Sequence, residues 1–152
     1  VPKNPGVLSA SGLLNAPVEH EVSVSFNKEL ESVTVEHVFK TLDKLDTEAR
    51  QLMISENADL GKVVITYYAD ICYIGQGYHL EVELKLLAQK PLQKIYRDFL
   101  ELHDRVYGHS VEGAVRIVNL RSVHQLPAVS PVSKLAINRG DCLKANREVF
   151  VF

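Results

Sequence analysis

The chain has 152 residues, of which 46% are hydrophobic and 24% charged, so it is long enough for one domain with a hydrophobic core. Its net charge of −2 excludes the large basic surface that is typical of nucleic-acid-binding proteins. The sequence has no secretory signal peptide and no apolar run of the roughly 20 residues that a membrane-spanning helix needs. We therefore expect a cytoplasmic protein that contacts neither membrane nor nucleic acid.

Charge is distributed unevenly along the chain. Residues 19–60 hold ten acidic and four basic side chains, while residues 115–152 hold two acidic and six basic ones. Such an imbalance is more typical of solvated faces or of a contact between subunits than of a polyanion-binding site.

The first third of the sequence predicts a connector, a strand and a helix. Residues 1–17 are rich in proline, glycine and small side chains, which is typical of a connector. Residues 20–26 alternate between apolar and polar side chains and predict a strand. After Thr34, a suitable N-cap, apolar residues recur at spacings of three and four, and residues 57–61 end the helix. The apolar stripe of this helix consists of Val35, Val38, Leu42, Leu45, Ala49 and Leu52.

The middle of the chain predicts a β-hairpin. Residues 62–74 are β-branched and aromatic with apolar side chains on both faces, whereas residues 78–86 are apolar on one face only. Between them, Gly75-Gln76-Gly77 predicts a turn of two or three residues, in which Gly75 and Gly77 supply the positive φ that such turns need.

The last third predicts a second helix from Pro91 to Gly108, a strand over residues 115–123, a loop-rich tail and a strand at 148–152. The order of elements predicts the α+β class, with a mostly antiparallel sheet and two main helices packed on one face. Because the chain starts at Val1 and ends within a strand pattern, we expect a piece of a longer protein. We expect residues 18–152 to form its single C-terminal domain, truncated at its end.

Motifs of several enzyme classes are absent from the sequence. It contains no GxxxxGK[ST] phosphate loop, no GxSxG, no HExxH and no GxGxxG. The two cysteines, Cys72 and Cys142, form no CxxC pair and lie near no histidine pair at zinc spacing, so no metal site is predicted. Without a phosphate loop, the chain offers no obvious nucleotide site of its own.

Two polar residues interrupt apolar patterns. Asp70 lies in an otherwise apolar strand, where a carboxylate needs a cation or a polar cleft, and Arg116 and Arg121 are the natural partners. His103 lies on the apolar face of the second helix, which is more typical of a hydrogen-bonded core histidine than of a catalytic one.

An ordered set of motifs resembles the C-terminal part of the hydantoinase A and 5-oxoprolinase family, which includes N-methylhydantoinases. The family patterns are Pro-Gly-x-x-Ser-Ala-x-Gly, Asp-x-Arg-Tyr-x-Gly-Gln before a Tyr-x-Leu strand, Phe-x-x-x-His-x-x-x-Tyr-Gly and Val-Asn-Leu-Arg. The matching residues are Pro5, Gly6, Ser9, Ala10, Gly12, Asp70, Tyr73, Gly75, Gln76, Tyr78, Leu80, Phe99, His103, Tyr107, Gly108, Val118, Asn119, Leu120 and Arg121. The chain departs from the pattern at Cys72, where the family has an arginine.

The resemblance implies a larger parent enzyme with an upstream, actin-like region that binds ATP and a divalent metal, and with a second subunit. Such parents couple ATP hydrolysis to the opening of a cyclic amide, and related proteins carboxylate acetone or acetophenone instead. This chain, which needs no cofactor in this reading, would complete a site or an interface and be inactive alone. A free-standing binding module is the remaining alternative.

The resemblance also suggests a candidate polar site or interface. It places Asp70, Tyr73, Gln76 and His103 where their donors and acceptors could converge at one end of the sheet, with Arg121 on the neighbouring strand. The alternative is that Gly75-Gln76-Gly77 is a solvent-exposed turn. No residue of the chain is assigned a catalytic role.

Overall fold

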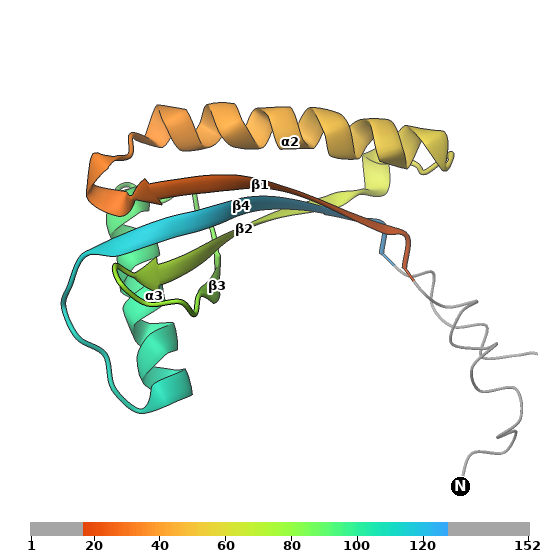
Figure 1. Ribbon diagram of the computed structural model, residues 1–152. Helices are drawn as coiled ribbons and strands as arrows, with labels where there is room; N and C mark the ends of the chain where they lie inside the picture. Colours follow the sequence, from red (N-terminus) through yellow and green to blue (C-terminus); the bar gives the residue numbers. More distant parts are fainter. Residues whose placement is uncertain (1–16, 128–152) are drawn as a thin grey trace, which may run out of the picture.

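The computed structural model describes residues 17–127, which form one sheet and two long helices (Figure 1). In chain order the elements are β1 (Glu19–Glu29), the 3₁₀ helix η2 (Leu30–Ser32), α2 (Val35–Ser55), the 3₁₀ helix η3 (Leu60–Lys62), β2 (Val64–Tyr73), β3 (Leu80–Glu83), α3 (Pro91–Tyr107) and β4 (Val115–Gln125). The expected strand at 148–152 lies outside this range. So does the expected connector over residues 1–17, except for residue 17.

The four strands form an antiparallel sheet in the order β1-β4-β2-β3. The last strand is therefore inserted between the first and the second. Helix α2 packs on β1 and β4, and α3 packs on β3. Because both helices contribute to one hydrophobic core, they cover the same face of the sheet and leave the other face free of helices. The predicted α+β class and helix placement are confirmed.

The helix boundaries follow from local sequence signals. The Thr34 side chain accepts a hydrogen bond from the His37 backbone N–H at 3.3 Å, as expected of an N-cap. Helix α3 starts at Pro91 and ends before Gly108, whose φ of 77° is the left-handed conformation of a C-cap. The buried stripe of α2 is shifted slightly from the predicted one, since Leu52 is exposed; it consists of Val38, Leu42, Leu45, Ala49 and Met53.

A β-bulge in β4 explains its irregular apolar pattern. Asn119 pairs with Asp70 of β2 and Ile117 pairs with Ile71, so Val118 has no partner on that strand. The extra residue keeps Ile117 and the next buried residue, Leu120, on the same face even though they are three apart. Asn119, which lies between them, and Arg121, which follows them, face the free side of the sheet.

The hairpin differs from the prediction. The connection between β2 and β3 is six residues long, from 74 to 79, and β3 has only four residues. Gly75 has the expected positive φ of 91°, but Gly77 does not. The prediction for Gly77 was therefore wrong, because the longer loop reverses the chain without a second left-handed residue. Within residues 17–127, no helix is long and apolar enough to span a bilayer.

Candidate functional site

The face of the sheet that carries no helix is polar. Side chains alternate along each strand, so the ladder places residues in rows across this face. One row holds Ser25, Asn119, Asp70 and Glu81, and the next holds Ser23, Arg121, Tyr68 and Glu83. We call this surface the open face.

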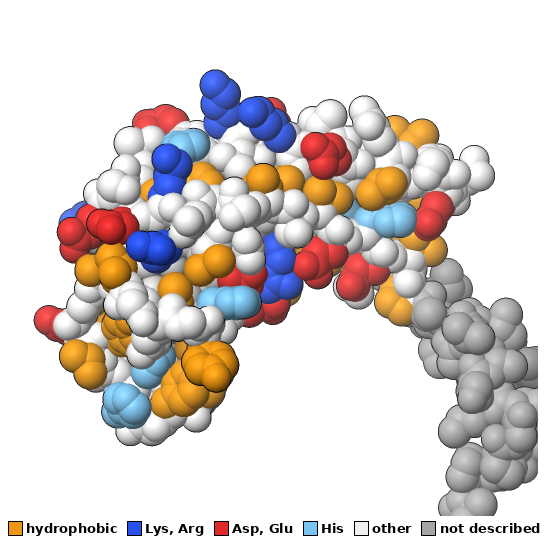
Figure 2. Space-filling view, viewed as in Figure 1, with side chains coloured by type: hydrophobic (Ala, Val, Ile, Leu, Met, Phe, Trp, Pro, Cys, Tyr) orange, Lys and Arg blue, Asp and Glu red, His pale blue; other side chains and the backbone are white. Residues whose placement is uncertain are grey.

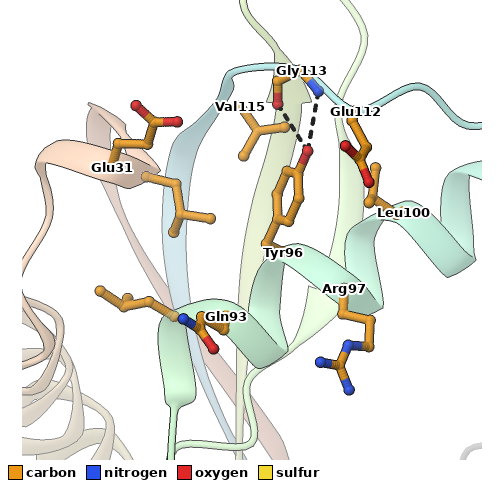
Figure 3. A pocket seen from close by; sticks show the side chains of 10 residues that line it. Glu31, Gln93, Tyr96, Arg97, Leu100, Glu112, Gly113 and Val115 are labelled. Atoms are coloured by element: carbon orange, nitrogen blue, oxygen red, sulfur yellow. Dashed lines mark hydrogen bonds between the residues drawn. The ribbon is translucent and has the colours of Figure 1, made fainter.

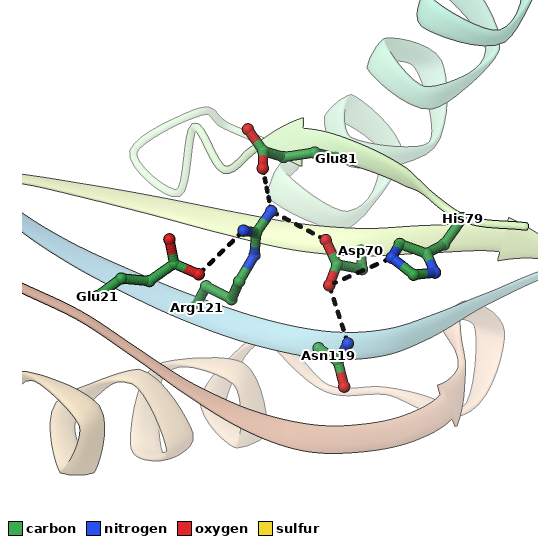
Figure 4. A network of polar contacts seen from close by, with 6 residues as sticks. All are labelled: Glu21, Asp70, His79, Glu81, Asn119 and Arg121. Atoms are coloured by element: carbon green, nitrogen blue, oxygen red, sulfur yellow. Dashed lines mark hydrogen bonds and ion pairs between the residues drawn. The ribbon is translucent and has the colours of Figure 1, made fainter.

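Arg121 is the centre of an ionic network on the open face (Figure 4). Its Nη2 lies 3.0 Å from Asp70 Oδ1 and also contacts Glu81 Oε2, and its Nη1 lies 3.0 Å from Glu21 Oε1. Burial disfavours the charged guanidinium, but the hydrogen bonds to Glu21 and Glu81 outweigh it and raise the pKa of Arg121. The network joins β1, β4, β2 and β3 through one side chain.

Asp70 is buried even though the open face has no helix, with 5% of the residue exposed. Besides Arg121, Asn119 Nδ2 donates to it at 2.9 Å, and His79 Nε2 lies 3.8 Å away. The prediction that Asp70 meets a cation is confirmed for Arg121. The other expected partner, Arg116, instead contacts Asn27 Oδ1 at 3.4 Å.

Tyr73 and His103 lie on the opposite face, in an aromatic cluster with Phe99. The rings of Tyr73 and His103 are 5.0 Å apart, and His103 is 5% exposed. His103 Nδ1 lies 2.7 Å from the carbonyl oxygen of His109, and the Tyr73 hydroxyl bonds both backbone groups of Val111. These contacts fix the loop between α3 and β4, which is the structural role expected of a core histidine.

The candidate residues therefore form two groups rather than one. Asp70 and Tyr73 are three positions apart on β2, so the alternation of the strand directs them to opposite faces. Gln76 belongs to neither group, because it is exposed in the β2–β3 loop, where its backbone N–H donates to the Tyr73 carbonyl oxygen at 3.1 Å. The structure does not gather the four side chains at one point.

A second polar cluster, not predicted from the sequence, lies between α2 and the sheet. Asp46 accepts hydrogen bonds from the hydroxyls of Tyr67 and Ser122, both at 2.6 Å, and lies 3.1 Å from His124 Nε2. Burial alone would raise the pKa of Asp46, but these hydrogen bonds lower it, whereas burial and Asp46 together raise the pKa of Tyr67.

This cluster is not arranged as a nucleophilic triad. Ser122 and His124 both contact the same oxygen of Asp46, so the serine hydroxyl donates to the carboxylate and not to the imidazole. His124 is fully buried, and its Nδ1 has no hydrogen-bond partner among the described residues. Sequence reasoning missed the cluster because the bulge at Val118 decides that Ser122 and His124 face the core.

A cavity of about 610 Å³ lies between η2, α3 and the start of β4 (Figure 3). Its wall includes the Tyr96 ring, whose hydroxyl bonds the backbone of Gly113. The remaining lining is aliphatic or charged apart from the amide of Gln93: Leu30, Glu31, Leu92, Gln93, Arg97, Leu100, Glu112 and Val115. None of the residues predicted as site residues lines this cavity.

Apolar side chains are exposed where the β2–β3 loop, the end of α3 and the loop after α3 meet. Figure 2 shows hydrophobic and histidine side chains gathered at this lower end of the molecule. Tyr78 is 84% exposed, and the Ile74 N–H donates to the Ala114 carbonyl oxygen at 3.0 Å, which ties the two loops together. We call this surface the hairpin-end patch; it comprises Ile74, Tyr78, Val106, Tyr107 and Val111.

The residues described in the structure include no group of three or more His, Cys, Asp or Glu side chains placed to hold a metal ion. The side chains of the open face form ion pairs and hydrogen bonds. Cys72 lies on this face opposite Arg116, and burial raises the pKa of its thiol despite the nearby guanidinium.

Comparison with known proteins shows similarity in structure. No protein-family model and no curated protein matches the sequence. An ATP-dependent caprolactamase from Pseudomonas jessenii superposes with a TM-score of 0.71 at 20% identity, over 83% of this chain and 19% of the caprolactamase chain. A nucleotide-free acetone carboxylase gives a TM-score of 0.66 at 21% identity, over 86% of this chain and 20% of that chain.

The chain thus corresponds to about a fifth of each of these larger proteins. At this level of identity the similarity establishes the fold. The fold of this chain is the one found in part of an ATP-dependent caprolactamase and of an acetone carboxylase, in agreement with the expected resemblance to hydantoinases and oxoprolinases at the level of the fold.

Proposed function

We propose that this chain is a domain of an ATP-dependent enzyme that opens a cyclic amide, and that the domain completes an interface rather than carrying the chemistry alone. The observation that carries the proposal is the superposition on a fifth of an ATP-dependent caprolactamase. The ordered hydantoinase and oxoprolinase motifs, which include both members of the Asp70–Arg121 ion pair, support it independently.

In this proposal ATP and a divalent metal bind to the upstream actin-like region of the parent. The described residues do not fit such a site, since they offer neither a phosphate loop nor a set of metal ligands. No reaction step is assigned to the groups of this chain. Its contribution is to hold a surface in place against the ATP-binding region or a second subunit.

The hairpin-end patch is the surface that we propose for this contact. It exposes Tyr78 and apolar side chains from three segments, and interfaces are enriched in aromatic residues of this kind. Gln76 lies in the same loop, and its amide offers both a donor and an acceptor to a partner backbone. The contacts of Tyr73 and His103 hold the loop after α3 in position beside it.

Although the chain has Cys72 where the family pattern has an arginine, this part of the sheet still carries a guanidinium. Arg116 lies directly opposite Cys72 in the ladder between β2 and β4. Its guanidinium contacts Asn27 Oδ1 at 3.4 Å.

A carboxylase is the alternative function, and the superposition on acetone carboxylase favours it. The test uses the full-length parent enzyme with its second subunit. We expect phosphate release from ATP that depends on hydantoin, 5-oxoproline or a lactam, with formation of the ring-opened acid. Turnover that requires bicarbonate and a ketone would assign the carboxylase instead, and ATP hydrolysis unaffected by either class would contradict both.

A further inference from the structure

Strand β1 forms one edge of the sheet, and within the part of the chain that the structure describes no strand pairs with its outer side (Figure 1). The Leu126 N–H donates to the Val18 carbonyl oxygen at 2.9 Å, so the backbone groups of Val18 point toward β4 and those of the next residue point away from it. This alternation continues along the strand. The residues with outward N–H and C=O groups are Glu19, Glu21, Ser23 and Ser25, and all four are exposed.

The opposite edge of the sheet is less suited to pairing with a further strand. It is formed by β3, which has only four residues and against which α3 packs. The Leu84 N–H donates to the Tyr67 carbonyl oxygen at 2.8 Å, so the outward backbone groups of β3 belong to Glu81 and Glu83. Short edge strands with charged side chains protect a sheet against further pairing. The edge of β1, a strand of 11 residues, is the one that is open to another strand.

The regular part of the β1 edge is the segment from Glu19 to Ser25. The register of β1 on β4 shifts between Ser25 and Lys28, and Asn27 has a positive φ of 45°, so the strand bulges there. Val22 is the centre of the regular segment. A twofold axis through Val22 would therefore pair the whole segment with the same segment of a second copy.

Such a pairing satisfies every outward backbone group of the segment. In an antiparallel ladder centred on Val22, each outward residue lies opposite an outward residue, so that the two exchange both backbone hydrogen bonds. No charged side chain lies directly opposite a like charge. The opposed residues are Glu19 with Ser25, His20 with Val24, Glu21 with Ser23, and Val22 with its copy.

The acidic side chains of the segment have partners within their own chain. Glu21 Oε1 lies 3.0 Å from Arg121 Nη1, and Glu19 Oε2 accepts a hydrogen bond from Gln125 Nε2 at 2.7 Å. The two copies of Glu21 are only diagonal neighbours in the ladder, at about 7–8 Å. Because each keeps the guanidinium of its own chain, their repulsion does not prevent the pairing.

The face that carries α2 is also compatible with a second copy. The pairing covers Val24, which is 38% exposed. Helix α2 lies over both β1 and β4. With strands spaced about 4.8 Å apart, two copies would place their α2 helices roughly 10 Å apart, close to the distance of about 8–10 Å at which helices pack.

We propose that this chain forms a twofold-symmetric dimer through β1, in which the two four-stranded sheets join into one continuous antiparallel sheet. The recognised partner is a second copy of the chain, bound by backbone hydrogen bonds along Glu19–Ser25. The proposal is independent of the proposed function, since it rests on the backbone of β1 and not on any contact with an ATP-binding region.

A disulfide on the twofold axis tests the register in the 152-residue chain. The two copies of Val22 form a pair without mutual backbone hydrogen bonds, where Cα atoms lie about 4.5 Å apart and a disulfide fits. Val22→Cys is combined with Cys142→Ser, which leaves the buried Cys72 as the one native cysteine. Mild oxidation should convert this variant to a covalent dimer on a non-reducing gel.

Val24→Cys, also combined with Cys142→Ser, is the matched control for the crosslink. Its two copies would lie roughly 13 Å apart along the ladder, beyond the reach of a disulfide, so we expect about tenfold less covalent dimer. Crosslinking of Val24→Cys that equals or exceeds that of Val22→Cys would overturn the proposal, as would the absence of crosslinking in both.

Sedimentation equilibrium over a range of concentrations gives a second measurement. The wild-type chain should have twice the mass of one chain, and Ser23→Pro should be a monomer, because it removes an outward N–H without breaking a bond to β4. Glu83→Pro removes an outward N–H from the β3 edge and should leave the dimer intact. A monomeric wild type overturns the proposal, as does a dimer that Glu83→Pro disrupts and Ser23→Pro does not. Circular dichroism checks that both variants fold, and if Ser23→Pro does not, the Val22→Cys crosslink decides.

Discussion

Arg121 Nη2 and Asp70 Oδ1 lie 3.0 Å apart across neighbouring strands, and Asp70 depends on this contact more than Arg121 does. Arg121 retains Glu21 and Glu81 if Asp70 is removed, whereas Asp70 retains only Asn119 and a distant His79 if Arg121 is removed. The carboxylate is also the more deeply buried partner. Loss of Arg121 should therefore destabilise the buried Asp70 more than loss of Asp70 destabilises Arg121.

Replacing Arg121 should destabilise the domain more than replacing Arg116. We expect Arg121→Ala to lower the free energy of unfolding by about 2–3 kcal/mol, because it leaves Asp70 buried without its cation. Arg116→Ala removes one contact of 3.4 Å and should cost under about 0.5 kcal/mol. Urea unfolding measures both values, and equal losses would show that Asp70 does not depend on Arg121.

The Asp46 cluster should make the free energy of unfolding depend on pH. The pKa of Asp46 is lowered on folding, so its stabilising effect is complete above the ordinary carboxyl pKa and is lost as the pH falls through the lowered pKa. Asp46→Asn should cost about 2–3 kcal/mol at pH 7. The difference in free energy of unfolding between this variant and the wild type should shrink below about pH 4.

Asp43→Asn is the matched control for Asp46, since Asp43 lies one turn earlier on α2 and is exposed. Urea unfolding at a series of pH values compares the two variants with the wild type. A cost for Asp46→Asn that stayed constant down to about pH 2 would show that the carboxylate is not the titrating group.

The two hairpin glycines should respond differently to substitution. Gly75 has a φ of 91°, so Gly75→Ala should cost about 1 kcal/mol and lower the melting temperature. At Gly77 no positive φ is needed and no atom lies within 4 Å of an added Cβ, so Gly77→Val should be nearly neutral. A larger loss at Gly77 than at Gly75 would mean that the loop adopts a different conformation.

Gln76→Ala distinguishes an interface from a solvent-exposed turn. In the full-length enzyme we expect at least a tenfold loss of activity or of affinity for the second subunit, about 1.4 kcal/mol, with an unchanged melting temperature for the domain. Tyr78→Ala should act in the same direction, and Gln51→Ala, on the exposed side of α2, is the control. Unchanged assembly and turnover in both loop variants would leave Gly75-Gln76-Gly77 as a turn only.

The isolated chain should neither bind nor hydrolyse ATP at ordinary concentrations. The reason is the lack of a phosphate loop in the sequence, together with the assignment of nucleotide binding to an upstream region. Isothermal titration with ATP and Mg²⁺ measures this directly. Micromolar affinity would place part of the nucleotide site in this chain.

Local sequence determined the elements and the fold class. The stripe from Val38 to Ala49, the N-cap at Thr34 and the Pro91 and Gly108 boundaries fix both helices, because they depend on side-chain spacing and on backbone preferences of single residues. The partner of Asp70 was also predictable, since a buried carboxylate requires a cation and the neighbouring apolar strand pattern offers only two arginines.

Only the tertiary structure decided which polar groups meet. One unpaired residue, Val118, sets the face of every later residue of β4, and so directs His124 to Asp46 while leaving Arg121 on the open face. The insertion of β4 between β1 and β2 then brings Glu21 and Asp70 to opposite sides of Arg121. A bulge and a strand order depend on pairing energies summed over the whole sheet, which no local pattern in the sequence records.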